Sequence, residues 1–104
     1  MTFGGTISDA RKKTGLSQKD LAALIKKEDG TPISTQYLND IERDRRNPPS
    51  DYILHQLAKA LDLSQEYLSF LAGQYPSDLR EINPSPERVE KAFQAFRKTL
   101  KGES

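Results

Sequence analysis

The chain has 104 residues, 35% hydrophobic and 30% charged, with a formal net charge of +1, and this length suits one domain with a modest core, alone or with an appendage. Because it contains no cysteine and a single histidine, His55, we exclude disulfides and cysteine-based zinc sites and expect no metal and no cofactor. No apolar run approaches the ~20 residues that a membrane span requires, and no secretory signal is evident, so we expect a cytoplasmic protein.

Apolar residues at helical spacing predict two helices in the first third of the chain. Ile7 and Ala10 favour a helix over residues 6–14, which Gly15 ends. Ser17 is suited to cap a second helix. The apolar face of this second helix consists of Leu21, Ala22, Leu24 and Ile25.

A loop and a third helix follow. Residues 26–32 read KKEDGTP and hold two turn signals, Asp-Gly and Thr-Pro. Ser34 or Thr35 caps the third helix, which we place at residues 34–43, with Leu38 and Ile41 on its apolar side. Residues 43–49 read RDRRNPP, so a positive segment follows the helix and its two prolines prevent the helix from continuing.

Two further helices complete the predicted domain. Ser50 caps the fourth helix and Ser64 the fifth, which Gly73 ends. The apolar stripe of the fourth helix consists of Ile53, Leu54, Leu57, Ala58 and Leu61. In the fifth helix, the side chains expected to point inward are those of Tyr67, Leu68 and Leu71.

The remainder of the chain predicts a linker and an amphipathic helix. Three prolines and little periodicity make residues 74–86 a surface linker between a domain over 1–73 and a helix within 87–104. The stripe of this last helix, too apolar to leave in water, consists of Val89, Phe93, Phe96 and Leu100. It either folds back on its own domain or pairs with a second chain; the fifth helix, through Tyr67, Phe70 and Leu71, is the other candidate dimer surface.

Three stretches in order carry a family resemblance: LSQKDLAALI, ISTQYLNDIERDRRNPPS and LHQLAKALDLSQEYL. They resemble the lambda-repressor-like helix-turn-helix domain, the Cro and repressor class that includes XRE-type bacterial regulators, over about residues 7–71. The resemblance implies an all-α, five-helix domain that binds a specific double-stranded DNA sequence. It also implies a dimeric transcriptional regulator, a repressor in our interpretation, with helix 34–43 in the major groove of a palindromic operator.

The polar side of the third helix is the expected base-reading surface. Gln36 and Asn39 are suited to paired hydrogen bonds with adenine, and Asp40 can accept one from a cytosine amino group. The residues expected to contact bases are Thr35, Gln36, Asn39 and Asp40. Donors for phosphates are expected around this helix, and the family uses the position of Gln18 for a DNA contact. The expected phosphate contacts are Gln18, Lys19, Ser34, Tyr37, Arg43, Arg45, Arg46 and Asn47.

The resemblance also implies an internal ion pair between Arg11 and Glu42, with a structural role. The chain departs from the family in residues 26–32, which are longer than the usual turn of about three or four residues. Either the second helix extends through Lys26 and Lys27, or a loop bulges out. The residue-by-residue DNA contacts depend on which alternative holds.

Two other classes of protein are alternatives to a DNA-binding regulator. A protein-interaction module of the same fold, antitoxin-like or an adaptor, is favoured by the low net charge and by Asp40 and Asp44. The basic residues Arg43, Arg45 and Arg46 argue against it. An enzyme is not expected, because the sequence offers no nucleophile–base pairing, metal-ligand cluster or Gly-rich phosphate loop.

Overall fold

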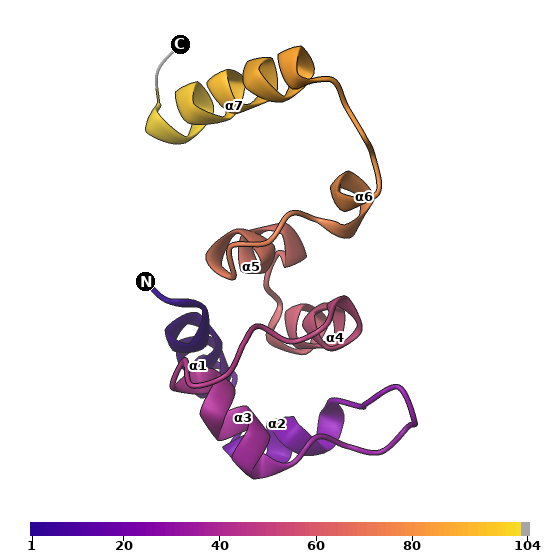
Figure 1. Ribbon diagram of the computed structural model, residues 1–104. Helices are drawn as coiled ribbons and strands as arrows, with labels where there is room; N and C mark the ends of the chain where they lie inside the picture. Colours follow the sequence, from indigo (N-terminus) through magenta and orange to yellow (C-terminus); the bar gives the residue numbers. More distant parts are fainter. Residues whose placement is uncertain (103–104) are drawn as a thin grey trace.

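The computed structural model describes residues 1–102, and this part of the chain is all helical, as predicted. It contains α1 (Phe3–Lys13), α2 (Gln18–Leu24), α3 (Thr35–Glu42), α4 (Asp51–Leu61), α5 (Gln65–Leu71), α6 (Ser77–Arg80) and α7 (Pro86–Lys101). Helices α1 to α5 gather around one core, while α6 and α7 lie beyond α5 at the other end of the molecule (Figure 1). None of the helices in residues 1–102 combines the length and the apolarity needed to cross a bilayer.

The core is built from the apolar stripes that the sequence predicts. Every helix from α1 to α5 contributes to it, and its fully buried large side chains are those of Ile7, Leu21, Ile25, Leu38, Leu54, Leu57 and Leu68. The serines predicted as caps, including Ser34 at α3, each accept a hydrogen bond from a backbone N–H in the first turn of their helix. Local capping and tertiary burial therefore agree on where four of the helices begin.

Several expectations at the ends and on the faces of helices are wrong. Helix α1 begins at Phe3 rather than at residue 6, because the side chain of Thr2 accepts a hydrogen bond from Gly5 N–H and caps it. Leu24, predicted in the apolar face of α2, is 56% exposed, and Tyr67, predicted to point inward, is 45% exposed. The end of α2 and the outer side of α5 thus carry apolar side chains in contact with solvent.

The long turn forms a hairpin, so the second of the two alternatives holds. Helix α2 stops at Leu24, and Ile25 adopts an extended conformation. Residues 25–33, which we call the hairpin, pair through an antiparallel bridge between Lys26 and Pro32 and a 2.9 Å hydrogen bond from Ile33 N–H to Ile25 O. The side chain of Gln56 in α4 accepts from Lys26 N–H (2.7 Å) and donates to Lys26 O (2.8 Å), which fixes the hairpin to the domain.

The predicted linker contains a helical turn. Residues 77–80 form α6, a single turn, where the prolines and weak periodicity predicted only an irregular surface segment. Arg80 of this turn makes an ion pair with Asp51 at the start of α4. This contact holds the linker against the domain. Its two residues lie far apart in the sequence, so no local sequence pattern predicts it.

A close approach of α1 to α3 depends on Gly4. A Cβ atom at this position would collide with the carbonyl oxygen of Ile41 and would lie 2.6 Å from that of Glu42. The backbone N–H of Gly4 also donates a 2.8 Å hydrogen bond to Asp44 Oδ1, and Asp44 adopts a left-handed conformation with φ of 57°. The segment after α3 therefore caps the start of α1.

A buried ion pair joins the same two helices further along. Arg11 donates two hydrogen bonds to Glu42 in a bidentate geometry, from Nε to Oε2 (2.7 Å) and from Nη2 to Oε1 (2.9 Å). Their side chains are 11% and 4% exposed. Burial alone would raise the pKa of Glu42, but the hydrogen bonds from Arg11 and Gln18 and the Arg11 charge together lower it.

We expect Gly4→Ala to lower the free energy of unfolding by about 1–3 kcal/mol, because α1 and α3 must separate to admit the methyl group. Gly5→Ala is the matched control, since its Cβ would meet only the Thr2 hydroxyl at 3.1 Å. There the gain in helix propensity offsets a small shift of that side chain. Urea denaturation compares the two, and equal stabilities would contradict the close approach at Gly4.

Removal of one partner from the ion pair leaves the other charge buried. We expect Glu42→Ala and Arg11→Ala each to lower the free energy of unfolding by about 3–5 kcal/mol. The double variant Arg11→Met/Glu42→Leu removes both charges at once and is expected to recover most of that loss. Denaturation of the natural chain and the three variants compares these losses; an unchanged melting temperature in Glu42→Ala would refute the structural role.

The lowered pKa of Glu42 also makes stability depend on pH. In the unfolded chain this carboxylate binds its proton near its ordinary pKa of about 4.3, but in the folded chain it does so only at lower pH. Its contribution is therefore present above that value and disappears as the pH falls through the folded pKa. We expect the free energy of unfolding of the natural chain to fall more steeply with decreasing pH than that of Arg11→Met/Glu42→Leu, which lacks this carboxylate. A difference that stays constant down to about pH 3 would contradict this linkage.

Candidate nucleic-acid interface

The exposed side of α3 carries a connected group of polar side chains. Gln36 Nε2 donates to Asp40 Oδ1 at 3.0 Å, one helical turn apart. Arg46 Nε reaches Asp40 Oδ2 at 3.4 Å, and its guanidinium lies 5.6 Å from the centre of the Tyr37 ring. Arg46 is therefore held over α3 by an ion pair and by a cation–π contact.

A second group connects α3 to the buried ion pair. Gln18 Nε2, at the start of α2, donates to Asn39 Oδ1 at 3.2 Å and to Glu42 Oε1 at 3.1 Å. Glu42 is in turn fixed by Arg11. A continuous set of hydrogen bonds thus runs from the α1–α3 ion pair to the amide of Asn39, which we call the Arg11–Asn39 network. It restricts the rotamers of Asn39 on the face of α3 that faces away from the core.

The structure assembles some of the predicted site residues and leaves others separate. Thr35 opens α3 and is exposed, and Ser34 caps this helix through Oγ, which accepts from Tyr37 N–H at 3.0 Å. Tyr37 is half-buried against the core, with the Arg46 contact on its ring. The remaining predicted phosphate donors, Lys19, Arg43, Arg45 and Asn47, are exposed, and none of them makes an ion pair within residues 1–102.

Two contacts of polar side chains do not follow from the sequence pattern. The pattern predicts a phosphate contact for Gln18, but its amide nitrogen is directed inward to Asn39 and Glu42, which lie on another helix. The pattern places Asp44 as an acid beside α3, but its carboxylate accepts a hydrogen bond from Gly4 N–H. The residue type itself is a signal for this role. Asp tolerates the left-handed conformation in which a chain often leaves a helix, so an Asp just after α3 indicates a turn there.

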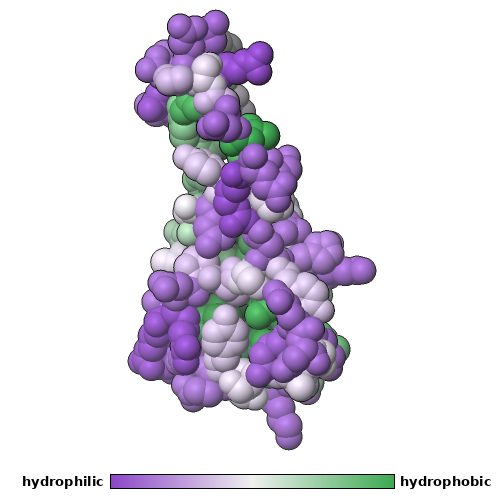
Figure 2. Space-filling view, turned by 45° about the vertical axis from the view of Figure 1, so that its right-hand side comes forward, coloured by the Kyte–Doolittle hydropathy of each residue, from purple (hydrophilic) through white to green (hydrophobic). Residues whose placement is uncertain are grey.

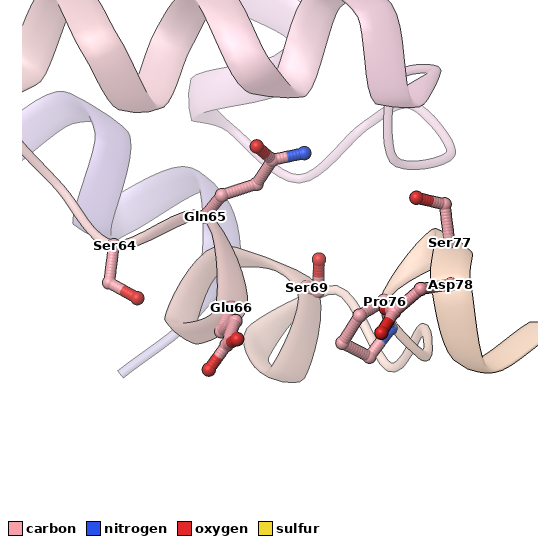
Figure 3. Close-up of a pocket in the computed structure, with 7 residues that line it drawn as sticks. All are labelled: Ser64, Gln65, Glu66, Ser69, Pro76, Ser77 and Asp78. Carbon is pink, nitrogen blue, oxygen red and sulfur yellow. The ribbon is translucent and has the colours of Figure 1, made fainter.

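A shallow pocket elsewhere does not assemble a reactive site. It lies between α5 and α6, and its lining is Ser64, Gln65, Glu66, Ser69, Pro76, Ser77 and Asp78. Figure 3 shows Gln65 turned toward α4, where its Oε1 lies 3.0 Å from His55 Nδ1, while Glu66 points to the opposite side. Within residues 1–102 no three His, Asp or Glu side chains form a group that could hold a metal ion. The α3 surface is thus the candidate site.

Comparison with known proteins bears on the fold of the chain. Among solved structures, the chain is similar to a chain of the SinR protein/SinI protein complex, with a TM-score of 0.54 and 23% sequence identity, covering 98% of this chain and 100% of that one. This likeness shows a shared fold. No curated protein matches the chain in sequence.

The family model HTH_3, described as helix-turn-helix, matches residues 7–68, which span α1 to most of α5. The match includes α2, the hairpin and α3, and so covers every residue of the Arg11–Asn39 network. More than half of the chain is covered. The protein therefore belongs to the helix-turn-helix family HTH_3, of the XRE and lambda-repressor-like type of DNA-binding regulators.

Proposed function

We propose that this protein is a dimeric transcriptional repressor that inserts α3 into the major groove of a palindromic DNA operator. The observation that carries the proposal is the Arg11–Asn39 network, which holds a base-reading amide in a fixed orientation on the helix that the family uses for recognition. Repression requires only that the bound protein occupy the operator, whereas activation would require a further surface.

The chemistry of α3 supports base reading by two amides. Asn39 Oδ1 accepts one hydrogen bond from Gln18 and keeps a second lone pair, and both hydrogens of Nδ2 remain available. This set matches the acceptor-plus-donor pair that adenine presents in the major groove. Gln36 keeps its oxygen and one amide hydrogen after its bond to Asp40. We therefore assign adenine contacts to both amides, with Thr35 beside them at the start of the helix.

Asp40 has a mixed role in this proposal. Its two oxygens already hold Gln36 and Arg46, and its side chain is only 15% exposed. This partial neutralisation lowers the electrostatic cost of a carboxylate close to phosphates. We propose that Asp40 positions these two neighbours and offers a remaining lone pair to a cytosine amino group.

The exposed cations and hydroxyls around α3 are proposed to bind the DNA backbone. Among the cations, Lys19 lies in α2, before α3 in the chain. Arg43, Arg45 and Arg46 follow the end of α3. Ser34, Tyr37 and Asn47 complete the proposed set, together with the backbone N–H of Gln18 at the start of α2, because both hydrogens of the Gln18 amide are directed to Asn39 and Glu42. Such contacts set the register of the protein on the duplex without reading its sequence. A protein that binds operators must be in the same compartment as the DNA, so the proposed function includes a cytoplasmic location.

A protein-interaction role is the second candidate function. SinR, a structural neighbour, is found in a complex with the protein SinI, and in this chain α5 and α7 expose apolar surface suited to a protein contact. The acids that favoured this role on the α3 side are engaged within the chain, Asp44 by Gly4 and Asp40 by Gln36 and Arg46. We therefore assign protein contact to the α5–α7 side and DNA contact to the α3 side.

Selection from a pool of random duplex DNA, followed by sequencing, tests the proposal. We expect an enriched near-palindrome whose half-sites lie about one helical turn (~34 Å) apart. In Gln36→Ala or Asn39→Ala, discrimination at the base pair that the lost amide reads should fall by about 1–3 kcal/mol. Gln94→Ala, the same change on exposed α7, is the control and should leave the motif intact.

Salt dependence separates base reading from phosphate attraction. We expect Arg45→Ala to weaken binding to all duplexes alike and to reduce the slope of log affinity against log salt by about 1. If binding is salt-sensitive but no motif is enriched, the protein only attracts phosphates, and the base-reading proposal is wrong.

A further inference from the structure

Helix α7 is amphipathic, yet the domain covers little of its apolar face. Phe96 contacts Phe70 of α5 with ring centres 6.3 Å apart, and Phe93 contacts Tyr75 at the same distance. No residue of α7 is buried, and Phe96 remains 48% and Leu100 57% exposed. The helix therefore folds back on its own chain only through a few aromatic edges.

The exposed apolar surface extends beyond α7 itself. Figure 2 shows hydrophobic surface just beneath the top lobe, which is α7, where the molecule narrows toward the domain. The large apolar side chains exposed on α5, the linker and α7 are Tyr67, Phe70, Tyr75, Leu79, Ile82, Val89, Phe96 and Leu100. So many exposed large apolar side chains are typical of a protein–protein contact.

The spacing on α7 is that of a coiled-coil seam. Val89, Phe93, Phe96 and Leu100 follow one another at intervals of four, three and four residues, the alternation of the a and d positions of a heptad. With Phe93 at a, the flanking e positions are Glu90 and Arg97. The flanking g positions are Ala92 and Thr99, which carry no charge.

These flanking residues favour one orientation of a paired helix. In an antiparallel pair of identical helices, e positions face e positions, so Glu90 of each chain meets Arg97 of the other, and the two-fold axis creates this ion pair twice. In a parallel pair, e positions face g positions, and Arg97 would meet Ala92 and form no ion pair. The charge pattern is thus complementary to itself only in the antiparallel arrangement.

We infer that the occupant of this face is α7 of a second copy of the chain, docked antiparallel, with reciprocal Glu90–Arg97 ion pairs at its edge. The inference deepens the dimer of the proposed function by naming its surface, and it rests on that function only for the role of the dimer on DNA. The stripe spans two heptads, fewer than the three or four that sustain a coiled coil alone. Phe70 and Tyr75, which already touch the stripe, therefore form part of the interface.

Sedimentation of the full chain without DNA, over a wide range of concentration, tests the inference. We expect the natural chain to be a dimer. Glu90→Arg and Arg97→Glu should each raise the dissociation constant about tenfold, because each replaces two attractive contacts by two repulsive ones. Glu87→Arg and Lys91→Glu are matched controls, since they make the same charge changes away from the seam and should leave the dissociation constant unchanged.

Mixing separates this geometry from other occupants. Glu90→Arg chains and Arg97→Glu chains should form mixed dimers with the natural affinity, and Glu90→Arg/Arg97→Glu should restore the homodimer. A monomeric natural chain, or seam variants that behave like the controls, would overturn the inference and leave another protein as the occupant. A monomeric natural chain would also contradict the dimeric part of the proposed function and its near-palindrome, whereas seam variants that behave like the controls would leave that function intact. Base reading is tested separately, because the loss of discrimination in the α3 variants does not depend on which surface forms the dimer.

Discussion

The buried ion pair between Arg11 and Glu42 is the interaction on which the rest of the structure depends. It joins the first helix to α3, the helix that we propose to read DNA, and through Gln18 it extends to Asn39. A buried ion pair contributes little net stability compared with apolar packing, but it enforces one geometry, because any other arrangement would leave a charge unpaired. In this chain that geometry places the Asn39 amide on the side of α3 that we propose to meet DNA, so under the proposed function the same contact serves both the fold and the reading of bases.

The long connection between α2 and α3 is compatible with this arrangement because it forms an ordered structure of its own. Ile25 and Ile33 are buried at its base, 1% and 4% exposed, so both ends of the hairpin belong to the core. Gln56 of α4 holds its backbone from the side. The additional residues therefore project away from the helix pair, and α2 still packs against α3.

The sequence predicts what is decided locally and misses what is decided by contacts between distant residues. Serine caps and apolar stripes are local, so the all-α fold and the helices α2 to α5 follow from them, as does the polar face of α3. The start of α1 is only partly of this kind: the Thr2 cap is a local signal that the apolar spacing does not reveal, whereas the contact from Asp44 lies forty positions from its partner Gly4. The inward role of Gln18 is hidden for the same reason, since a side chain on another helix defines it. For α6, a single turn held by an ion pair to α4, no periodicity exists to be detected.

The most direct test of this account is the operator discrimination of Arg11→Met/Glu42→Leu, measured as the ratio of affinities for the selected operator and for the same duplex with the base pair read by Asn39 changed. Circular dichroism first verifies that the variant is folded. The account predicts that this ratio falls several-fold, because Gln18 loses its anchor and Asn39 its fixed orientation, while affinity for unrelated DNA is unchanged. A folded variant that discriminates as well as the natural chain would contradict the account, because the ion pair would then serve the fold alone.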